Sequence, residues 1–425
     1  MDATLPTNVD RRLSTILTQL ARDEPVIAIH GARSVGKSTL LRQFANEHGV
    51  PVLDLDDLGV RNAVSANPSL AVNDTTPVCI DEYQRAPDVL DAIKARLNRE
   101  GSRAGTAVLT GSTRQDALPL AAQSLTGRLH SLTIWPLSQG EISGVREDLV
   151  EAMFESPESA VIKYPSSSTG RVEYAERISA GGFPLALRRP SAQRGRWFDD
   201  YVRLSIERDV VALTRVRRRQ QLRELLERLA GRTAQVLNLS QAATGLGIDR
   251  HTAENYARLL EDLFLIRRLP AWGKTLRSRS IASPKVHVVD SGVGARLLRV
   301  TPSRLTTFEP TALSEFGHLL ETFVVGELTK QASWLDGHVD LGHWRTHEGE
   351  EVDLVMERDD GRVLAFEVKA GERVDPAHLK GLFTLRHKLG SRLVAGVALT
   401  TGSRSYTLDD RIHVMPIDRL WRAVG

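Results

Sequence analysis

The sequence has a single cysteine, Cys79, and no long apolar run. One cysteine excludes an internal disulfide, and its apolar, strand-like surroundings fit a small buried core residue. No stretch of about 18 apolar residues is present, so no membrane-spanning helix is predicted. The first residues, MDATLPTNVDRRL, carry an early acid and lack the apolar segment of a secretory signal. We therefore expect a cytoplasmic protein without a membrane partner.

An excess of charge of one sign is also missing. The chain has 56 lysines and arginines against 53 acids, a net charge of +3, which does not by itself indicate nucleic acid. Basic residues gather locally, most densely in TRVRRRQQLR (214–223) and next in LRSRS (276–280). No internal repeat is visible, and 425 residues with 41% hydrophobic content predict about two to four globular domains.

A glycine-rich segment near the start has the pattern of a phosphate-binding loop. In PVIAIHGARSVGKSTLL the pattern G-x-x-x-x-G-K-[ST] is complete, between an apolar strand and a helix. The backbone N–H groups would surround phosphate oxygens, the lysine would reach the β- and γ-phosphates, and the serine hydroxyl would bind Mg²⁺. The alternative is a chance glycine-rich turn, against which the flanking strand and helix argue. The residues expected at the nucleotide are Gly31, Ala32, Arg33, Ser34, Val35, Gly36, Lys37, Ser38 and Thr39.

Polar residues end two further apolar strands. In TPVCIDEYQ the apolar strand ends at Asp81 and Glu82. We expect Asp81 to bind the Mg²⁺ held by the loop serine and Glu82 to polarise the attacking water. In TAVLTGSTR (106–114) the apolar strand is followed by the polar residues Thr110, Ser112 and Thr113. A parallel sheet would bring them to the same carboxyl edge as the two acids. The alternative for the acids is a pair of exposed carboxylates at a strand end. Next along the chain, Arg128 is a candidate γ-phosphate sensor or arginine finger, and a surface salt bridge explains it equally well.

The order of these motifs, GxxxxGKS, IDE, LTGS and GR…WPLSQGE, resembles the AAA-superfamily ATPases of bacteria and archaea that carry a C-terminal domain of unknown function. The resemblance implies ATP as the nucleotide, where the phosphate loop alone would also admit GTP. It covers nearly the whole chain, because later stretches match as well: GGFPLAL (181–187), YVRLSIERDV (201–210), SPKVHVVDSGV (283–293), GHLLETFVVGEL (317–328) and EVDLV…FEVK.

The middle of the chain has helix-turn-helix spacing. Ser240 is the expected cap of a first helix, GLGID is the turn, and RHTAENYARLLEDLFL is a longer second helix followed by an apolar strand. This predicts a winged helix whose second helix offers four residues to a groove. The alternative is a lid or a packing domain, because Asp249 and Glu254 dilute the basic charge. The four residues are Arg250, His251, Thr252 and Asn255.

Two β-rich runs near the C-terminus, EVDLVMER and VLAFEVKA, flank a turn around Asp-Asp-Gly. A three-residue loop with Gly361 in the left-handed conformation would place Asp353 opposite Glu367, with Lys369 on the same face. A two-residue turn would instead place Asp353 opposite Val368, on the other face. We favour the first register because it explains the three polar residues.

Two carboxylates at one point stay ionised together only around a cation, and thiol-free oxygen ligands suit Mg²⁺ or Mn²⁺. The D…(x13)…E-x-K arrangement of Asp353, Glu367 and Lys369 resembles the signature of restriction-endonuclease-like nucleases. In that family a preceding helix adds an acid, for which Glu321 on the apolar face of its helix is the candidate. The alternative is a structural salt bridge in a nuclease fold that has lost its chemistry.

The sequence therefore predicts an α/β protein with four parts: a P-loop AAA-type ATPase core (1–145), a helical lid or connection (146–212), a winged-helix-like domain (213–282) and a restriction-endonuclease-like domain (283–425). The leading hypothesis is that ATP and Mg²⁺ in the first part control a Mg²⁺- or Mn²⁺-dependent nuclease-like domain that acts on nucleic acid, DNA in the first place. We also allow for a homo-oligomer. The alternatives are a nucleotide-switched regulatory or toxin-like binding protein with an inactive nuclease fold, and an ATPase that docks protein partners.

Overall fold

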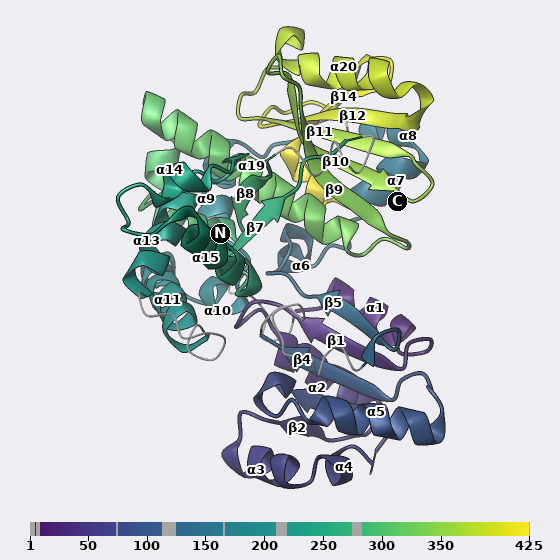
Figure 1. Ribbon diagram of the computed structural model, residues 1–425. Coiled ribbons are helices and arrows are strands. Elements are labelled where there is room, and N and C mark those ends of the chain that lie inside the picture. The colour runs from purple at the N-terminus through teal and green to yellow at the C-terminus, as the bar shows by residue number, and fades with distance from the viewer. Residues whose placement is uncertain are drawn as a thin grey trace. The chain divides into compact units, whose positions relative to one another are not determined.

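The computed structural model describes residues 5, 9–73, 75–112, 125–164, 166–209, 219–273 and 283–424. The chain divides into two units (Figure 1). We call Thr7–Leu137 with Asp262–Phe264 the N-terminal unit, and Ser138–Glu261 with Leu265–Gly425 the C-terminal unit.

The N-terminal unit is built on a five-stranded sheet of order β2-β3-β4-β1-β5, in which every recorded pair is parallel. Parallel strands are covered on both faces and therefore read as continuous apolar runs, as in VIAIH. The parallel P-loop-type sheet predicted from the sequence is confirmed. The strands are β1 (Val26–His30), β2 (Val52–Asp54), β3 (Val78–Asp81), β4 (Ala107–Gly111) and β5 (Leu129–Thr133), and the helices are α1 (Arg12–Leu20), α2 (Lys37–Glu47), α3 (Leu58–Ala66), α4 (Pro68–Ala71) and α5 (Val89–Glu100).

Helices bury both faces of this sheet. On one face, Val89, Ile93 and Leu97 of α5 share a core with alternate strand residues such as Ala28 and Leu109. α2 packs against β3 and β4, with α1 beside it. Helix packing on both faces thus fixes the carboxyl edge of the sheet, from which the loop between β1 and α2 extends.

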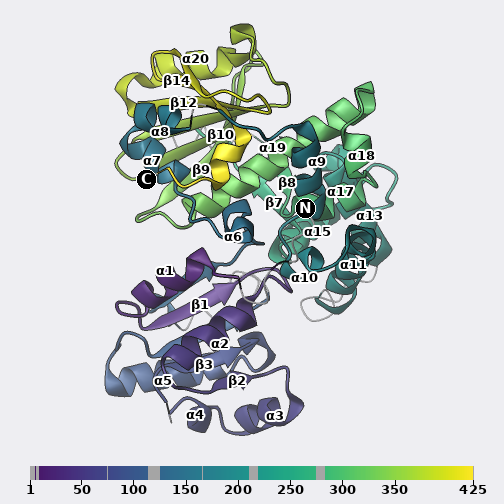
Figure 2. The ribbon, with the colours of Figure 1, turned by 180° about the vertical axis from the view of Figure 1, so that it is seen from behind.

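The C-terminal unit contains a six-stranded mixed sheet of order β13-β14-β12-β11-β10-β9. β9, β10 and β11 run antiparallel, β11, β12 and β14 run parallel, and β13 is antiparallel to β14. The long helix α19 covers one face and α20 the other, as Figure 2 also shows. Their bounds are α19 (Pro310–Ala332), β9 (Val339–Arg345), β10 (Glu351–Arg358), β11 (Val363–Lys369), α20 (Lys380–Leu389), β12 (Leu393–Thr400), β13 (Tyr406–Asp409) and β14 (Ile412–Pro416).

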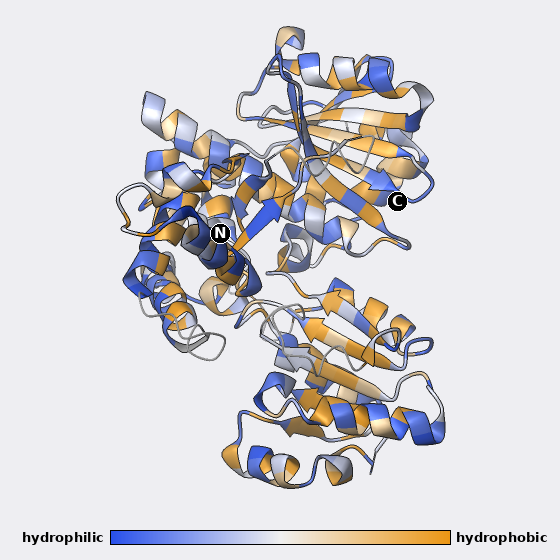
Figure 3. Cartoon of the chain, viewed as in Figure 1, coloured by the Kyte–Doolittle hydropathy of each residue, from blue (hydrophilic) through white to orange (hydrophobic). Residues whose placement is uncertain are grey.

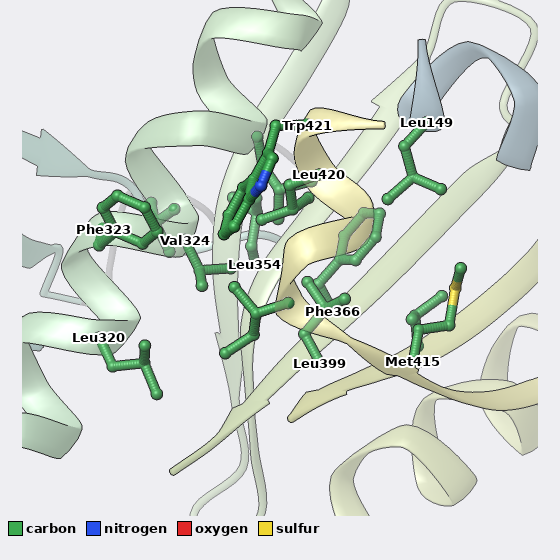
Figure 4. Packing of buried hydrophobic residues seen from close by; sticks show 14 of the residues in the cluster. Leu149, Leu320, Phe323, Val324, Leu354, Phe366, Leu399, Met415, Leu420 and Trp421 are labelled. Carbon is green, nitrogen blue, oxygen red and sulfur yellow. The ribbon is translucent and has the colours of Figure 1, made fainter. Parts of the chain in front are cut away.

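Side chains of alternate strand residues separate into the two cores. Leu354 and Phe366 point toward Leu320 and Val324 of α19 (Figure 4), whereas Val355 belongs to the core under α20. The period of two along a strand places successive side chains on opposite faces of the sheet. The apolar strands stand out in Figure 3, where they carry the orange of hydrophobic residues.

The β10–β11 hairpin has the predicted register. Leu354 pairs with Phe366, and the Gly361 N–H donates to the Arg358 carbonyl at 2.8 Å. Gly361 has a φ of +80°, a conformation that side chains with a Cβ rarely adopt. The loop is therefore the three-residue one, and Asp353 lies level with Glu367.

Helices before the six-stranded sheet correct the predicted lid. Leu149 and Met153 of α7 lie in the same core as α19, so α7 belongs to the fold of this sheet and not to a separate lid over residues 146–212. The Ser- and Pro-rich stretch 154–174 also contributes buried side chains, among them Phe154 and Val161. The helices are α6 (Gln139–Ser143), α7 (Leu149–Glu155), α8 (Pro157–Lys163), α9 (Arg171–Ala180), α10 (Pro184–Leu187), α11 (Ser191–Leu204), α17 (Ser291–Leu297) and α18 (Pro302–Leu305), and Ser205–Asp209 is a π-helix.

The middle of the C-terminal unit combines three helices with a small antiparallel sheet of order β6-β8-β7. β8 pairs with both other strands, so the boundary predicted at 282/283 separates it from its own sheet. Asn238 caps α14 by accepting the Gln241 N–H at 3.0 Å, and the predicted cap Ser240 lies within the helix. The elements are α13 (Arg219–Ala230), β6 (Gln235–Val236), α14 (Leu239–Ala243), α15 (Arg250–Asp262), β7 (Ile266–Leu269) and β8 (Lys285–Val288).

A membrane-spanning helix is not found in the part of the chain that the structure describes: none of its helices is long and apolar enough. The longest helix, α19, has 23 residues and contains charged side chains such as Glu321 and Lys330. This agrees with the expectation drawn from the sequence.

The core under α19 makes a stability prediction. Phe366 is fully buried, so Phe366→Ala should destabilise the protein by about 3–5 kcal/mol, because apolar packing is removed and a residual cavity is left. Phe308→Ala is the control, because that side chain is 79% exposed and should change stability by about 0.5 kcal/mol or less. Urea unfolding followed by tryptophan fluorescence measures both, since Trp421 lies in the same core. Equal shifts would contradict the packing.

Candidate functional site

The phosphate-type loop connects β1 to α2, where the sequence placed it. Two of its glycines are required by geometry. A Cβ on Gly31 would lie 2.3 Å from the Ile134 carbonyl oxygen, and Gly36 has a φ of +103°. Residues 31–36 therefore form a close backbone turn that leads into the N-terminus of an eleven-residue helix. Backbone N–H groups at such a terminus attract anions.

Lys37 is held inside this loop. Its Nζ donates to the carbonyl oxygens of Gly31 and Ala32, each at 3.0 Å, and the side chain is buried. An ammonium that donates to neutral carbonyls can exchange them for the more strongly accepting oxygens of a phosphate. Lys37 thus lies within the loop, and its contact with phosphate stays a prediction.

Arg11 supports the loop from outside, and sequence reasoning missed it. Its Nη1 donates to the Val35 carbonyl at 2.8 Å, and its Nη2 donates to the Trp135 carbonyl at 2.7 Å. The guanidinium thus ties the loop to the segment that follows β5. Arg11 lies outside the sequence motif of the loop. Its partners are 24 and 124 positions away, so no local pattern in the sequence indicates these contacts.

The predicted acids gather at the carboxyl edge of the sheet. The Thr110 hydroxyl donates to the Asp81 carboxylate and accepts the Glu82 backbone N–H at 3.3 Å, so it holds the side chain of the first acid and the backbone of the second. Gln84 donates to Glu82 and, at 3.1 Å, to Ser112. Asp81 and Glu82 are buried, which contradicts the alternative of two exposed carboxylates. Thr113 lies outside the described residues.

Arg128 is not at this edge. It precedes β5, its carbonyl accepts the Val26 N–H at 3.1 Å, and its Nη1 donates to Asn98 at 2.6 Å. Val26 begins β1, whereas the loop follows the end of that strand, about 13 Å away at the rise of a parallel strand. The prediction of a γ-phosphate sensor within the chain is therefore wrong. An arginine finger toward a neighbouring subunit stays a prediction.

The C-terminal unit brings together the acids predicted for a second site. Asp353 of β10 and Glu367 of β11 are both buried, and Lys369 Nζ lies 2.7 Å from Glu367 Oε1. The second oxygen of Asp353 accepts the Val368 N–H at 2.9 Å. Glu321 approaches from α19, as the resemblance implied. The three acids thus form one cluster, which we call the acid cluster.

A residue that sequence reasoning missed lies at the centre of the acid cluster. Lys285, the first residue of β8, places its Nζ 2.8 Å from Glu321 Oε1 and 2.8 Å from Asp353 Oδ1, with only 3% of the residue exposed. The only signal in the sequence is a lone charge at the start of the apolar run KVHVV. Within the described ranges, no three or more His, Cys, Asp or Glu residues are arranged to hold a metal ion. An ammonium group lies between two of the three acids, so the cluster in this arrangement does not fit the predicted Mg²⁺ or Mn²⁺.

Burial shifts the protonation of this cluster. It raises the pKa of Glu367 to about 8, helped by the negative charge of Asp353 and opposed by Lys369. Burial also raises the pKa of Glu321 well above its usual range. For Lys285 burial acts downward, but the carboxylates of Asp353 and Glu321 outweigh it and raise the pKa of the ammonium. The cluster therefore retains a proton in addition to its lysines near neutral pH.

Comparison with known proteins identifies the N-terminal unit. Residues 23–143 match a family model described as an AAA domain, and residues 171–304 and 316–420 match two models, each described as a domain of unknown function (DUF8612 and DUF4143). Together with the phosphate-type loop and the buried acids, the first match defines an AAA-type P-loop ATPase domain. This domain is followed by two regions that match families of unknown function.

Two relatives are similar over most of the chain. Uncharacterized proteins of Mycobacterium tuberculosis and Mycobacterium bovis are each 26% identical over 399 residues, which cover 93% of this chain and 81% of the relative. Among solved structures, a Walker-type ATPase of Pyrococcus abyssi is 16% identical, with a TM-score of 0.41 over 68% of this chain and 96% of that chain. A RuvB Holliday junction branch migration motor of Thermotoga maritima is 15% identical, with a TM-score of 0.31 over 62% and 90%.

The raised pKa of Glu367 predicts a pH dependence of stability. A carboxyl group whose pKa rises from an ordinary 4.5 to about 8 on folding binds its proton more tightly in the folded state. Its contribution to stability is therefore lost as pH rises from about 4.5 through 8. Between pH 5 and pH 8 the melting temperature of the wild type should fall more steeply than that of Glu367→Gln, whose amide does not titrate.

Glu147 serves as the internal reference for these melts. Burial raises its pKa to about 7, so it lowers the melting temperature of both proteins alike over the same range. The difference between the two curves then reports Glu367 together with its effect on the neighbouring Glu321. Parallel curves from pH 5 to pH 8 would show that Glu367 is ionised throughout.

Proposed function

We propose that the protein binds and hydrolyses ATP with Mg²⁺ in its N-terminal unit, and that the nucleotide state controls a nuclease-like C-terminal unit that binds nucleic acid. The observation that carries the proposal is the set of buried acids oriented by Thr110 at the same sheet edge as the glycine loop and Lys37. A carboxylate for the metal and a second one for water, beside an anion-binding loop, is the arrangement that phosphoryl transfer needs.

Each residue of the ATP site has a defined task in this proposal. The loop N–H groups and Lys37 hold the β- and γ-phosphates, and Ser38 with Asp81 holds the metal. Glu82 orients the attacking water, and Thr110 keeps its backbone in place. Bound Mg²⁺ would supply neutralisation of the phosphate charge. The buried Lys37 ammonium, held by the carbonyl oxygens of Gly31 and Ala32, is the observation that an anionic ligand fits this loop.

A nuclease-like identity of the six-stranded sheet rests on its order of elements and on Asp353, Glu367 and Lys369, which share one face. Lys285, however, is bonded to two of the expected metal ligands. This favours the alternative in which the nuclease-like fold binds without cleaving, and we propose no cleavage step for this arrangement. The hypothesis of a Mg²⁺- or Mn²⁺-dependent nuclease gains no support from it.

A winged helix is the interpretation that the middle of the C-terminal unit supports. The order α13-β6-α14-α15-β7-β8, with β8 between the other two strands, is that of a helix-turn-helix followed by a wing. Arg250, His251 and Asn255 are exposed on α15. The two acids that dilute their charge are engaged elsewhere. Asp249 caps the helix by accepting the Thr252 N–H at 2.7 Å, and Glu254 lies 2.7 Å from Arg268. The helix is thus available to nucleic acid.

The ATP site is tested by two substitutions with different expected outcomes. Lys37→Ala should weaken ATP binding by about tenfold or more, because it removes a charge-assisted hydrogen bond to phosphate. Glu82→Gln should keep the affinity and lower turnover by about a hundredfold, since only the water-orienting carboxylate is removed. Nucleotide titration and phosphate release measure the two quantities. Lys94→Ala on α5 is the control and should change neither. Unaltered affinity in Lys37→Ala would overturn the assignment of this site.

Nucleic-acid binding is tested at the basic cluster that leads into α13. Arg219 is exposed there, and Arg217 and Arg218 lie outside the described residues. Replacing all three by alanine should weaken DNA binding and reduce the slope of log affinity against log salt by about one unit for each phosphate that is no longer neutralised. The matched control removes three exposed arginines of the N-terminal unit, Arg22, Arg99 and Arg103. If both triple variants keep the wild-type slope, the cluster does not bind phosphates.

A further inference from the structure

Lys285 connects two parts of the C-terminal unit that serve different purposes. It begins β8, the middle strand of the small sheet, where it pairs with Val236 and Leu269. Its ammonium leaves that sheet and reaches α19 and β10, the elements that carry Glu321 and Asp353. The cation between Glu321 and Asp353 is therefore supplied by the winged-helix-like part and not by the nuclease-like sheet, which contributes Lys369 beside Glu367.

The burial of this ammonium shows that the contact is specific. A lysine with 3% exposure is strongly unfavourable without counter-ions, and each of its two carboxylate contacts is 2.8 Å long. Asp353 is fixed further by the Val368 N–H, so its position does not depend on Lys285 alone. Asp353 is thus held within its own β10–β11 hairpin, and Lys285 is the part that can be exchanged.

The acid cluster also has an acceptor left over. Glu367 Oε2 is buried and accepts no hydrogen bond from the described residues, although Oε1 is bound to Lys369. Three carboxyl groups surround two ammonium groups, so the two lysines alone cannot balance three ionised carboxylates. A divalent cation carries one positive charge more than the ammonium that it would replace. The cluster therefore has the charge and the spare oxygen for such an exchange.

We infer that Lys285 is a built-in cation that keeps the site of Asp353, Glu321 and Glu367 closed to divalent metal, and that metal enters only when β8 withdraws its lysine. The arrangement is an autoinhibitory contact: the winged-helix-like part occupies the metal position of the nuclease-like part. A ligand that shifts β8 would open the site. The inference rests on the proposed nuclease-like character of this sheet. Its readout, metal binding, is independent of ATP hydrolysis and of nucleic-acid binding.

The test uses the full chain without nucleotide, so that Ser38 and Asp81 contribute no ATP-dependent metal response. Lys285→Met keeps the length and apolar stem of the side chain and removes its charge. Mn²⁺ binding is measured by calorimetric titration and by the Mn²⁺-dependent rise in melting temperature. The variant should bind Mn²⁺ at least tenfold more tightly than the wild type, and Lys285→Met combined with Asp353→Asn should abolish that gain.

The matched control is Lys330→Met on α19. Lys330 is also buried and lies 2.6 Å from the buried acid Glu327, so it tests whether the removal of any buried, paired lysine creates Mn²⁺ binding. It should gain none. Wild type and Lys285→Met with equal Mn²⁺ affinity would overturn the inference, as would a gain that Asp353→Asn leaves intact.

Failure to fold also decides the question. If Lys285→Met is unfolded without metal, the inference requires that millimolar Mn²⁺ restores the folded state, since the divalent ion replaces the missing charge. A variant that stays unfolded with Mn²⁺ would show that Lys285 is only a structural counter-ion. Loss of ATP hydrolysis in Lys37→Ala or Glu82→Gln has no bearing on either outcome, so the two proposals fail separately.

Discussion

The C-terminal unit depends on one ammonium group buried between two carboxylates. Lys285 joins the small sheet of the winged-helix-like part to α19 and β10, and these three elements come from widely separated parts of the chain. Buried ions are unfavourable unless they are paired, so displacing any of these elements would leave a buried charge without its partner. The same contact determines the charge of the cluster, because it places an ammonium group beside two of the acids for which the sequence predicts a metal.

Several motifs that resemble a known family have a structural role around this centre. In WPLSQGE, Ser138 and Glu141 form a capping box at the start of α6, and the Gln139 N–H donates to the buried Glu327 at 2.8 Å. In GGFPLAL, the Gly182 N–H donates at 2.7 Å to Asp290 of VVDSG. A Cβ on Gly181 would lie 2.3 Å from that carboxylate. These motifs therefore fix the junctions of helices and strands in the C-terminal unit and give no evidence of a ligand.

The two sites of the protein are built on different principles. At the nucleotide site, neutral groups hold the charged side chains in position. The Thr110 hydroxyl binds the Asp81 carboxylate, and the loop carbonyls bind the Lys37 ammonium. In the acid cluster, lysines and carboxyl groups pair with one another within the chain, and burial, helped by the charge of Asp353, raises the pKa of Glu367 to about 8. The first site is arranged to receive a charged ligand directly, whereas the second has to break an internal ion pair before it can.

Local rules were sufficient for much of this protein. The pattern G-x-x-x-x-G-K-S, the apolar strands that end in Asp81 and Thr110, and the Gly361 turn that sets Asp353 opposite Glu367 all follow from chain geometry over a few residues, or from the shared edge of parallel strands. Only the tertiary structure decided the rest. Lys285 meets partners 36 and 68 positions away, Arg11 reaches a carbonyl 124 positions away, and β8 joins a sheet across a predicted domain boundary. Local periodicity shows that a residue is buried and on which face it lies. It does not show which distant charge it meets, because the folded arrangement of whole elements determines that pairing.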